Sequence, residues 1–442
     1  MHGCTENMTH AALREPSSPF AGRGFPLRTP LAAALAALVL LAGGCETEPK
    51  PVPAGPDYAR ELAPGENALR LLGPNDPLPD LGTPYRLRDP FLTQALDRSI
   101  QWFEAPSSRQ RMDAWKQYCT WEQASASVRA FKQLLQESPD EATFVAAVKE
   151  NFQVWQTVGY NRKGVVLFTG YYTPEFKGSL TQSDEFKYPL FKRPADLVTD
   201  PVTGEPKGRR MPDGSTGEWP GRRQLIESGA FKGTELVWLR SALDVYIIEV
   251  NGSAKVLLPD GRPFYVGYAG KTGRPYVGLG KSMVDAGLIP RDKLSLKAIM
   301  DAYEKNPAQV EALMWKNENM VFFSTYDGGN WPAGSLGVRV TEKESLATDK
   351  KVYPPGGVVL VNTQAINFGG TRQPFARYML DQDTGGAIKA PGRADIYMGI
   401  GKAAEILAGG QYSEGTMFYF FLKPEKVAAF SGGSAASRSA GK

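Results

Sequence analysis

The sequence of 442 residues has few of the side chains on which many enzymes depend. Its only histidines are His2 and His10, and its three cysteines are Cys4, Cys45 and Cys119. Catalytic triads with a histidine base and histidine-ligated metal sites are therefore excluded from the main body of the chain. Cys119, the one cysteine of that body, cannot form an intramolecular disulfide or a thiolate metal site alone. No cofactor or metal is expected, and acid–base chemistry is left to carboxylates, tyrosine or lysine.

The chain also lacks a strong excess of charge of either sign. Its 51 lysines and arginines nearly balance 47 acidic residues, which gives a formal net charge of +4. Proteins that bind nucleic acid usually carry a marked basic surface, so no nucleic-acid partner is expected. The 47 glycines and 34 prolines favour a turn-rich, mainly β structure over a helix bundle.

No apolar run is long enough to span a bilayer, which takes roughly 20 residues. The apolar run that exists, residues 31–41, follows Arg23 and Arg28 and ends in small residues directly before Cys45. A basic stretch, a short apolar segment and a small-residue exit are typical of a secretory signal. Residues 1–44 are therefore predicted to be a signal peptide.

Two outcomes of this processing are considered. In the first, Cys45 is acylated, as its position resembles that in bacterial lipoproteins, and residues 45–56 form a proline-rich tether. Glu46 beside it resembles lipoproteins sent to the outer membrane, which predicts a lipid anchor at the periplasmic face of that membrane. In the second, cleavage after a small residue gives a soluble periplasmic protein. We favour the lipoprotein because of the tether-like composition.

The pattern along the main body predicts helices first and short strands later. Residues 57–152 are predicted to be helical, with helices at 90–103 and 124–136 and another starting around Pro139. Strands are expected at 164–170, 236–239, 246–250, 255–258 and 264–268. Further helices are expected at 282–286, 294–303 and 402–408, and one that starts at Asn306-Pro307.

The densest functional signal lies between residues 381 and 401. Asp383 and Asp395 bracket a turn rich in glycine and proline, and glycine permits sharp turns or close approach to a ligand. Residues 392–397 are predicted to form a strand on which Asp395 and Tyr397 share one face. A further acid, Asp349, follows a short strand and a polar turn.

The segment QDTGGAIK followed by RADIYMGIG resembles the signature of the membrane-bound lytic transglycosylase A family. Asp349, Asp383 and Asp395 resemble the three aspartates after which the family's C-terminal 3D domain is named. Further blocks follow the family's order between residues 167 and 422: FTGYYTPEF, YPLFKRPADLV, LVWLRSALDVYIIEVNGSAKV, DGRPFYVGYAGKTGRPYVGLGK and PAGSLGVRVT.

The resemblance implies a mainly β (α+β) fold. A double-psi β-barrel domain would be interrupted by a second small β domain at residues 173–319, with a groove between the two. Residues 57–172 would contain the helical part and the start of the barrel, and 320–430 the rest of the barrel. A disordered tail is expected at 431–442.

The resemblance also implies a lytic transglycosylase that cleaves the β-1,4 bond between N-acetylmuramic acid and N-acetylglucosamine in peptidoglycan without water, leaving a 1,6-anhydro ring. Asp395 corresponds to the family's single catalytic aspartate. Because the attacking hydroxyl belongs to the sugar, one carboxyl group can protonate the leaving oxygen and then accept the proton of that hydroxyl. Asp395 must then hold a proton near neutral pH, so we expect apolar surroundings, supplied in part by Ile396 and Tyr397.

Supporting roles are assigned to other polar and aromatic residues. Asp383 is expected either to stabilise charge at the sugar C1 or to anchor a turn, and for Asp349 the turn is favoured. Lys389 and Arg393 are expected to keep these acids ionised. The candidate substrate-binding residues are Tyr171, Tyr172, Asn251, Tyr268, Tyr276, Lys389 and Arg393. The tyrosines suit sugar stacking, but a place in the β core is an equal alternative.

The sequence departs from the family's pattern at four positions of the expected substrate site. Glu249 and Asn251 stand where the family has glutamines, Ala254 replaces a glycine, and Thr272 replaces an asparagine. These changes do not affect acid catalysis but leave the contacts with the sugar open.

Two other functions remain open at this stage. A hydrolase on the same barrel would use Asp383 or Asp349 as a second carboxylate at roughly 6.5–9.5 Å from the first. A peptidoglycan-binding lipoprotein without catalysis would need no acid in the position of Asp395. We rank the transglycosylase first, the hydrolase second and the binding module third.

Overall fold

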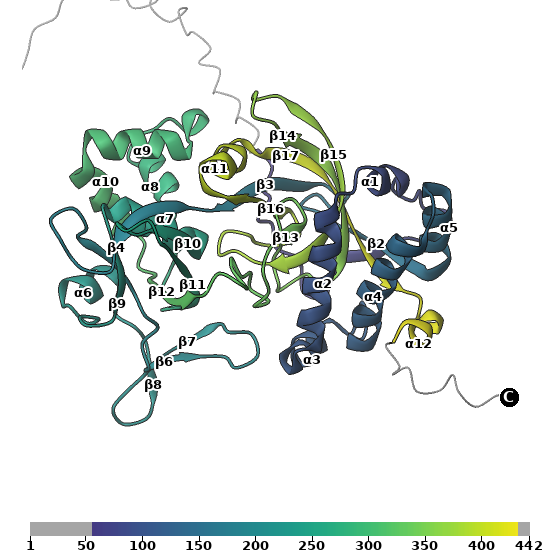
Figure 1. Ribbon diagram of the computed structural model, residues 1–442, viewed down its shortest axis with the longest axis horizontal. Helices are drawn as coiled ribbons and strands as arrows, with labels where there is room; N and C mark the ends of the chain where they lie inside the picture. The colour runs from purple at the N-terminus through teal and green to yellow at the C-terminus, as the bar shows by residue number, and fades with distance from the viewer. Residues whose placement is uncertain (1–54, 432–442) are drawn as a thin grey trace, which may run out of the picture. The chain divides into compact units, whose positions relative to one another are not determined.

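The computed structural model describes residues 55–431 (Figure 1). The predicted signal peptide, the acylation site Cys45, most of the tether and the tail after residue 431 lie outside the described residues. None of the helices within residues 55–431 combines the length and the apolar character needed to cross a membrane.

The N-terminal part is helical, as predicted. Its helices are α1 (Gly82–Arg86), α2 (Pro90–Glu104), α3 (Pro106–Met112), α4 (Trp121–Glu137) and α5 (Glu141–Asn151). The side chain of Asp89 accepts from the N–H of Phe91 and so caps α2, which begins with a proline. The helix start predicted around Pro139 is confirmed, but α5 begins at Glu141 and not at Pro139, because Asp140 is the N-cap and accepts from the N–H of Thr143.

Six strands form a closed barrel. They are β3 (Val166–Thr173), β13 (Ser345–Ala347), β14 (Val358–Ile366), β15 (Arg372–Asp383), β16 (Arg393–Ile400) and β17 (Tyr412–Leu422). Their order is β17-β14-β15-β13-β16-β3, and β17 also pairs with β3, which closes the sheet. The pairs β3–β16 and β13–β15 are parallel. The mainly β fold with a barrel is confirmed.

Other elements extend and cover the barrel. β1 (Leu69–Leu71) and β2 (Phe152–Thr157) continue the sheet beside β17. Helix α2 lies against β15 and α4 against β17, while α11 (Gly401–Gly410) lies on β3 and β16 (Figure 1). Phe168, Ile396 and Phe420 are fully buried in the shared core, and each such side chain contributes about 1.5–3 kcal/mol through burial.

The chain leaves the barrel after β3 and forms a second sheet. Its order is β12-β11-β10-β4-β9-β5. The strands are β4 (Glu175–Ser179), β5 (Tyr188–Phe191), β9 (Glu235–Leu239), β10 (Ser253–Leu257), β11 (Pro263–Lys271) and β12 (Val321–Tyr326). Because β12 still belongs to this sheet, the sheet extends past residue 319. We call residues 175–326 the inserted domain.

Smaller elements complete the inserted domain and the C-terminal end. The helices are α6 (Arg222–Glu227), α7 (Ala242–Asn251), α8 (Leu279–Asp285), α9 (Leu296–Lys305) and α10 (Pro307–Met314). A separate three-stranded sheet contains β6 (Leu197–Thr199), β7 (Pro206–Arg210) and β8 (Thr216–Gly217). After β17 the described part of the chain contains one more short α-helix, α12 (Val427–Phe430).

The predicted strand at 246–250 was wrong, because these residues lie in helix α7. The side chain of Ser241 accepts from the N–H of Asp244, which is a helix N-cap. Gly252, with φ 74°, ends the helix in the left-handed conformation that glycine adopts most readily. The apolar run alone did not separate helix from strand, but the serine cap does.

Candidate active site

Asp395 lies in a row of four residues that crosses four neighbouring barrel strands. Asp395 on β16 pairs with Thr169 on β3 and, on its other side, with Ala347 on β13. Ala347 in turn pairs with Asp383 on β15. Two strand spacings place the Cα atoms of the two aspartates roughly 10 Å apart, and the residue between them has only a methyl side chain.

The carboxylate of Asp395 is held by two side chains. Arg393 donates from Nε to Oδ1 at 2.9 Å and from Nη2 to Oδ2 at 3.1 Å. The hydroxyl of Thr169 also donates to Oδ1. The side chain of Arg393 is 29% exposed and that of Asp395 is 11% exposed. The carboxylate is therefore shielded from water but still reachable.

The prediction that Ile396 and Tyr397 would give Asp395 apolar surroundings was wrong. Ile396 is fully buried in the barrel core, on the other face of β16. The hydroxyl of Tyr397 shares a hydrogen bond of 2.9 Å with Thr173. The polar groups around Asp395 come instead from the same strand and from β3, whose parallel pairing the sequence pattern did not reveal.

Asp383 is bound by three donors. Its Oδ1 accepts from the N–H groups of Ser335 and Thr384, both at 2.8 Å, and its Oδ2 accepts from the hydroxyl of Tyr171 at 2.9 Å. Burial raises the pKa of Asp383 above its ordinary value, and these hydrogen bonds oppose the rise. Burial and the charge of Asp383 raise the pKa of Tyr171 strongly, so its hydroxyl remains a donor.

Asp349 is bound by the backbone alone. Oδ1 accepts from the N–H of Lys351 at 2.9 Å, and Oδ2 accepts from the N–H of Ala390 at 2.8 Å. Ala390 has φ 60°, a left-handed conformation that is unfavourable for alanine. Asp349 thus ties β13 to the loop between Asp383 and Asp395, and helps to hold a strained residue of that loop in place.

The predicted substrate-binding tyrosines divide into two groups. Tyr172 packs in the buried core, and only its hydroxyl reaches Glu405, at 3.5 Å. Tyr268 and Tyr276 expose 44% and 46% of their surface, so their rings remain accessible. Partial burial raises the pKa of the Tyr276 hydroxyl, and the hydroxyl of Tyr246 and the nearby charge of Arg393 oppose the rise. Tyr276 is therefore near the ion pair of Asp395.

The other two predicted contacts take different positions. The side-chain amide of Asn251 donates to the carbonyl of Ile247 at 2.9 Å, within its own helix. Lys389 is exposed and forms no ion pair with a residue of the described range. Arg393 was expected beside Asp383 or Asp349, but it pairs with Asp395 instead. Lys389 holds none of the three aspartates in this structure.

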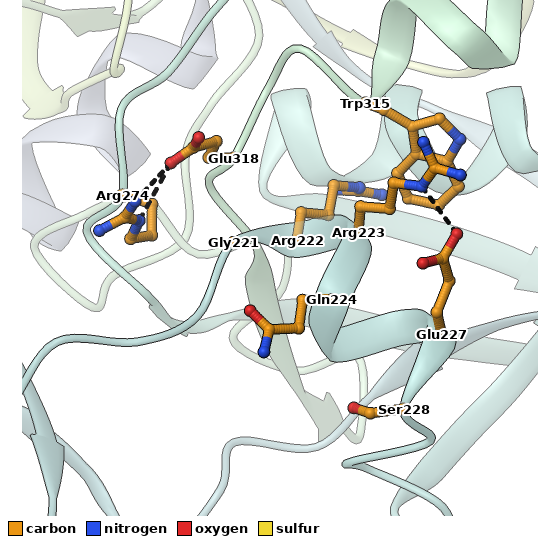
Figure 2. A pocket seen from close by; sticks show the side chains of 9 residues that line it. All are labelled: Gly221, Arg222, Arg223, Gln224, Glu227, Ser228, Arg274, Trp315 and Glu318. Carbon is orange, nitrogen blue, oxygen red and sulfur yellow. Dashed lines mark hydrogen bonds and ion pairs between the residues drawn. The ribbon is translucent and has the colours of Figure 1, made fainter. Parts of the chain in front are cut away.

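Glu249, which departs from the family's pattern, forms a buried ion pair with Arg222. Arg222 also lines a cavity of about 680 Å³ on the inserted domain (Figure 2). The other residues that line it are Gly221, Arg223, Gln224, Glu227, Ser228, Arg274, Trp315 and Glu318. Each of its arginines is paired with a glutamate, so the cavity offers no unpaired positive charge, and no predicted site residue lines it.

No group of three or more histidine, cysteine, aspartate or glutamate side chains within residues 55–431 is arranged to hold a metal ion. Cys119 is a free, buried thiol, and burial raises its pKa.

Three contributors to the site were missed at the level of sequence. Thr169 donates to Asp395, Ala347 separates the two aspartates, and Ser335 anchors Asp383. Thr169 and Ser335 lie inside segments that were matched to the family, but neither residue type nor spacing marks them. Only strand pairing and the path of the linking segment bring them to the aspartates.

Comparisons with known proteins agree with this architecture. Residues 167–324 match the model of the MltA specific insert domain, and residues 344–421 match that of the 3D domain. The chain is 32% identical over 283 residues to the membrane-bound lytic murein transglycosylase A of Escherichia coli K12, covering 63% of this chain and 72% of that protein. The protein of the same name from Vibrio cholerae is 32% identical over 279 residues, 62% of this chain and 69% of that protein.

Solved structures show the same fold. E. coli MltA with bound chitohexaose superposes with a TM-score of 0.61 at 23% identity, covering 84% of this chain and 97% of that chain. The barrel, the inserted domain and the two matched domain models thus coincide in one chain. The chain belongs to the family of the membrane-bound lytic murein transglycosylase A.

Proposed function

We propose that this protein is a lytic transglycosylase that cleaves the β-1,4 bond between N-acetylmuramic acid and N-acetylglucosamine in peptidoglycan, with Asp395 as its catalytic acid and base. One observation carries the choice of residue. Of the three aspartates, Asp395 alone receives no backbone N–H among the described residues. Side-chain partners can move aside for a substrate, whereas the backbone donors of Asp349 and Asp383 are fixed by the fold.

The reaction balances with one carboxyl group. Asp395 donates its proton to the glycosidic oxygen as the bond between that oxygen and C1 breaks. The C6 hydroxyl of the muramic acid then attacks C1 and gives its proton to the carboxylate of Asp395. Asp395 is thereby returned to its starting form, and no water is consumed.

The ion pair between Arg393 and Asp395 has to break before the first of these steps. An arginine beside a carboxylate favours the charged form, whereas proton donation requires the neutral form. The guanidinium also donates to the carbonyl of Ala387 at 3.3 Å, in the loop that precedes β16. We expect the bound strand to separate Arg393 from Asp395 by taking over one of its hydrogen bonds.

Asp383 is suited to stabilise positive charge at C1 rather than to activate water. It lies in the same row as Asp395, on the far side of Ala347. A hydrolase would need its carboxylate to accept a proton from water, but Oδ1 accepts from two backbone N–H groups that the fold fixes, and Oδ2 accepts from the hydroxyl of Tyr171. This arrangement favours the transglycosylase over the hydrolase.

The same proposal includes the place of the protein in the cell. Cys45 carries a lipid anchor that holds the protein at the periplasmic face of the outer membrane, where the glycan strands of peptidoglycan are its partner. The relatives are named membrane-bound. Replacement of Cys45 by alanine is expected to move the protein from the membrane to the soluble periplasmic fraction.

Mass spectrometry of the products from purified sacculi tests the reaction. Anhydromuropeptides released by residues 46–442, and not by the Asp395→Asn variant, would establish both the reaction and its acid. Products with reducing ends would assign the chain to the hydrolases. Binding to sacculi without any release would favour a binding module.

A further inference from the structure

Arg111, in the last turn of α3, connects two segments that are far apart in the chain. Its Nε donates to the carbonyl of Val202 at 2.8 Å, and its Nη1 donates to the carbonyl of Ser335 at 3.0 Å. Val202 lies in the turn between β6 and β7, and Ser335 follows β12 and precedes β13 in the chain. The β6–β7 hairpin is labelled in Figure 1. One guanidinium therefore joins the helical part, the hairpin of the inserted domain and the segment that leads back to the barrel.

This arginine has no acidic partner among residues 55–431, unlike Arg109 on the same helix, which pairs with Glu122. Burial lowers the pKa of the Arg111 guanidinium. Arg111 is half-buried; removing part of a cation from water without a carboxylate is costly, and two carbonyl oxygens offset only part of that cost. The placement of Arg111 therefore suggests a role other than simple stabilisation of the fold.

The hairpin tip is ordered by its own contacts. The side chain of Asp200 accepts from the N–H groups of Val202 and Thr203, both at 2.9 Å, and pairs with Lys207 at 2.9 Å. These contacts fix the turn that contains the Val202 carbonyl. The hairpin tip therefore meets Arg111 as a preformed turn.

The backbone of Ser335 connects Arg111 with Asp383. Its carbonyl is held by Arg111, and its N–H donates to Oδ1 of Asp383 at 2.8 Å. Oδ2 of the same carboxylate accepts from Tyr171, whose strand also carries Thr169, a partner of Asp395. A series of hydrogen bonds thus leads from the hairpin tip to Asp383 and Tyr171, and the backbone of β3 connects Tyr171 with Thr169.

We propose that Arg111 is a positioning residue that makes the orientation of Asp383 depend on the seating of the β6–β7 hairpin. This inference rests on the proposed function and adds a conformational control of the active site. With the hairpin seated, Arg111 fixes the Ser335 peptide and thereby Asp383; with the hairpin lifted, that peptide and the carboxylate lose their order. A polymeric strand can then be admitted before the site is fully assembled.

The test compares variants of the full-length chain. Arg111→Gln removes the charge and the fork of donors, and Arg111→Lys keeps the charge but not the two directed hydrogen bonds. Arg109→Gln is the matched control, because it removes a guanidinium from the same helix without touching the hairpin or Ser335. We expect both Arg111 variants to lose about tenfold in kcat with KM changed by less than about twofold, and the control to stay within about twofold.

A double-mutant cycle tests the route through Asp383. In an Asp383→Asn background, Arg111→Gln should reduce kcat by less than about twofold further, because the group through which it acts is already impaired. Effects that multiply in full would overturn the proposal. So would equal losses in Arg109→Gln, or full activity in Arg111→Lys, which would assign the effect to charge alone.

Hydrogen exchange provides a readout that does not depend on turnover. In Arg111→Gln, faster exchange is expected at residues 200–205 and at the Ser335 amide, whereas Asp383→Asn should affect the Ser335 amide and leave the hairpin unchanged. If exchange at residues 200–205 and at the Ser335 amide were unchanged in Arg111→Gln, Arg111 would not link the hairpin to Asp383. If the wild-type protein released no anhydromuropeptides, the proposed function would fail, while the exchange experiment would still decide whether Arg111 links hairpin and Asp383.

Discussion

The hydroxyl of Tyr171 on β3 donates to Oδ2 of Asp383 on β15 at 2.9 Å, across the two strands that lie between them in the barrel. The intervening strands carry Asp395 and the small side chain of Ala347. The tyrosine therefore links Asp383 to β3, the strand whose Thr169 donates to Asp395, the proposed catalytic acid.

Replacing Tyr171 by phenylalanine is expected to lower kcat roughly fivefold, because one hydrogen bond contributes about 1 kcal/mol net. The activity on sacculi at saturating substrate measures this loss. Tyr172→Phe is the control, since its hydroxyl reaches only Glu405, at 3.5 Å and away from the aspartates. Equal losses in the two variants would argue against a specific role of Tyr171.

Asp395→Asn is expected to reduce the rate by roughly 10²- to 10⁴-fold, the usual contribution of a general acid and base. The amide keeps the size of the side chain but has no proton to transfer, so the melting temperature should change little. Release of anhydromuropeptides and thermal unfolding measure the two effects. A large fall in melting temperature together with the activity would instead indicate a structural role.

Asp349→Ala is expected to destabilise the fold by about 2 kcal/mol, because two backbone N–H groups lose their acceptor. Denaturant unfolding measures the loss. Asp213→Ala is a suitable control, because its carboxylate also accepts from a turn N–H, that of Ser215, but on an exposed hairpin. A variant of Asp349 that kept full stability would favour a role in substrate binding.

The raised pKa of the buried Glu344 leads us to expect that the stability of the fold depends on pH. Burial, helped by the charge of Asp89, raises the pKa of this carboxyl group to about 9. Neither oxygen has a hydrogen-bond partner within the described range, and the closest cation is Nη1 of Arg377 at 3.7 Å. Between the unfolded pKa near 4.5 and about 9, the folded chain keeps a proton that the unfolded chain has released. Stability therefore falls as the pH rises through this window.

The Glu344→Gln variant should not show this fall in stability with rising pH, because the amide is neutral at every pH. Thermal unfolding at pH 5 and pH 8 is expected to show the variant gaining stability relative to the wild type at the higher pH. Glu342→Gln is the control, since its side chain is 53% exposed and pairs with Lys343. Parallel pH dependence in the wild type and the Glu344 variant would contradict the prediction.

Much of the fold was determined by local sequence signals. Asp89 with Pro90 and Asn306 with Pro307 mark helix starts that the structure reproduces. The strand predicted at residues 392–397 is present as β16, which continues to Ile400, and the resemblance of the motifs around Asp383 and Asp395 indicated the barrel. Helix α7 escaped prediction because apolar residues at 245–248 suit a helix and a buried strand equally well.

The sequence by itself limited the chemistry that is possible. Without histidine in its main body, the chain was left with carboxylates, tyrosine or lysine for acid–base work, and the resemblance to the family favoured the aspartates. Only the tertiary structure decided which groups meet those carboxylates. Thr169 reaches Asp395 across 226 positions of the chain, and Ser335 reaches Asp383 across 48. Alternation along a strand tells which face a residue occupies, but not the strand beside it or its register. Those are set by the closure of the barrel and by the packing of its core.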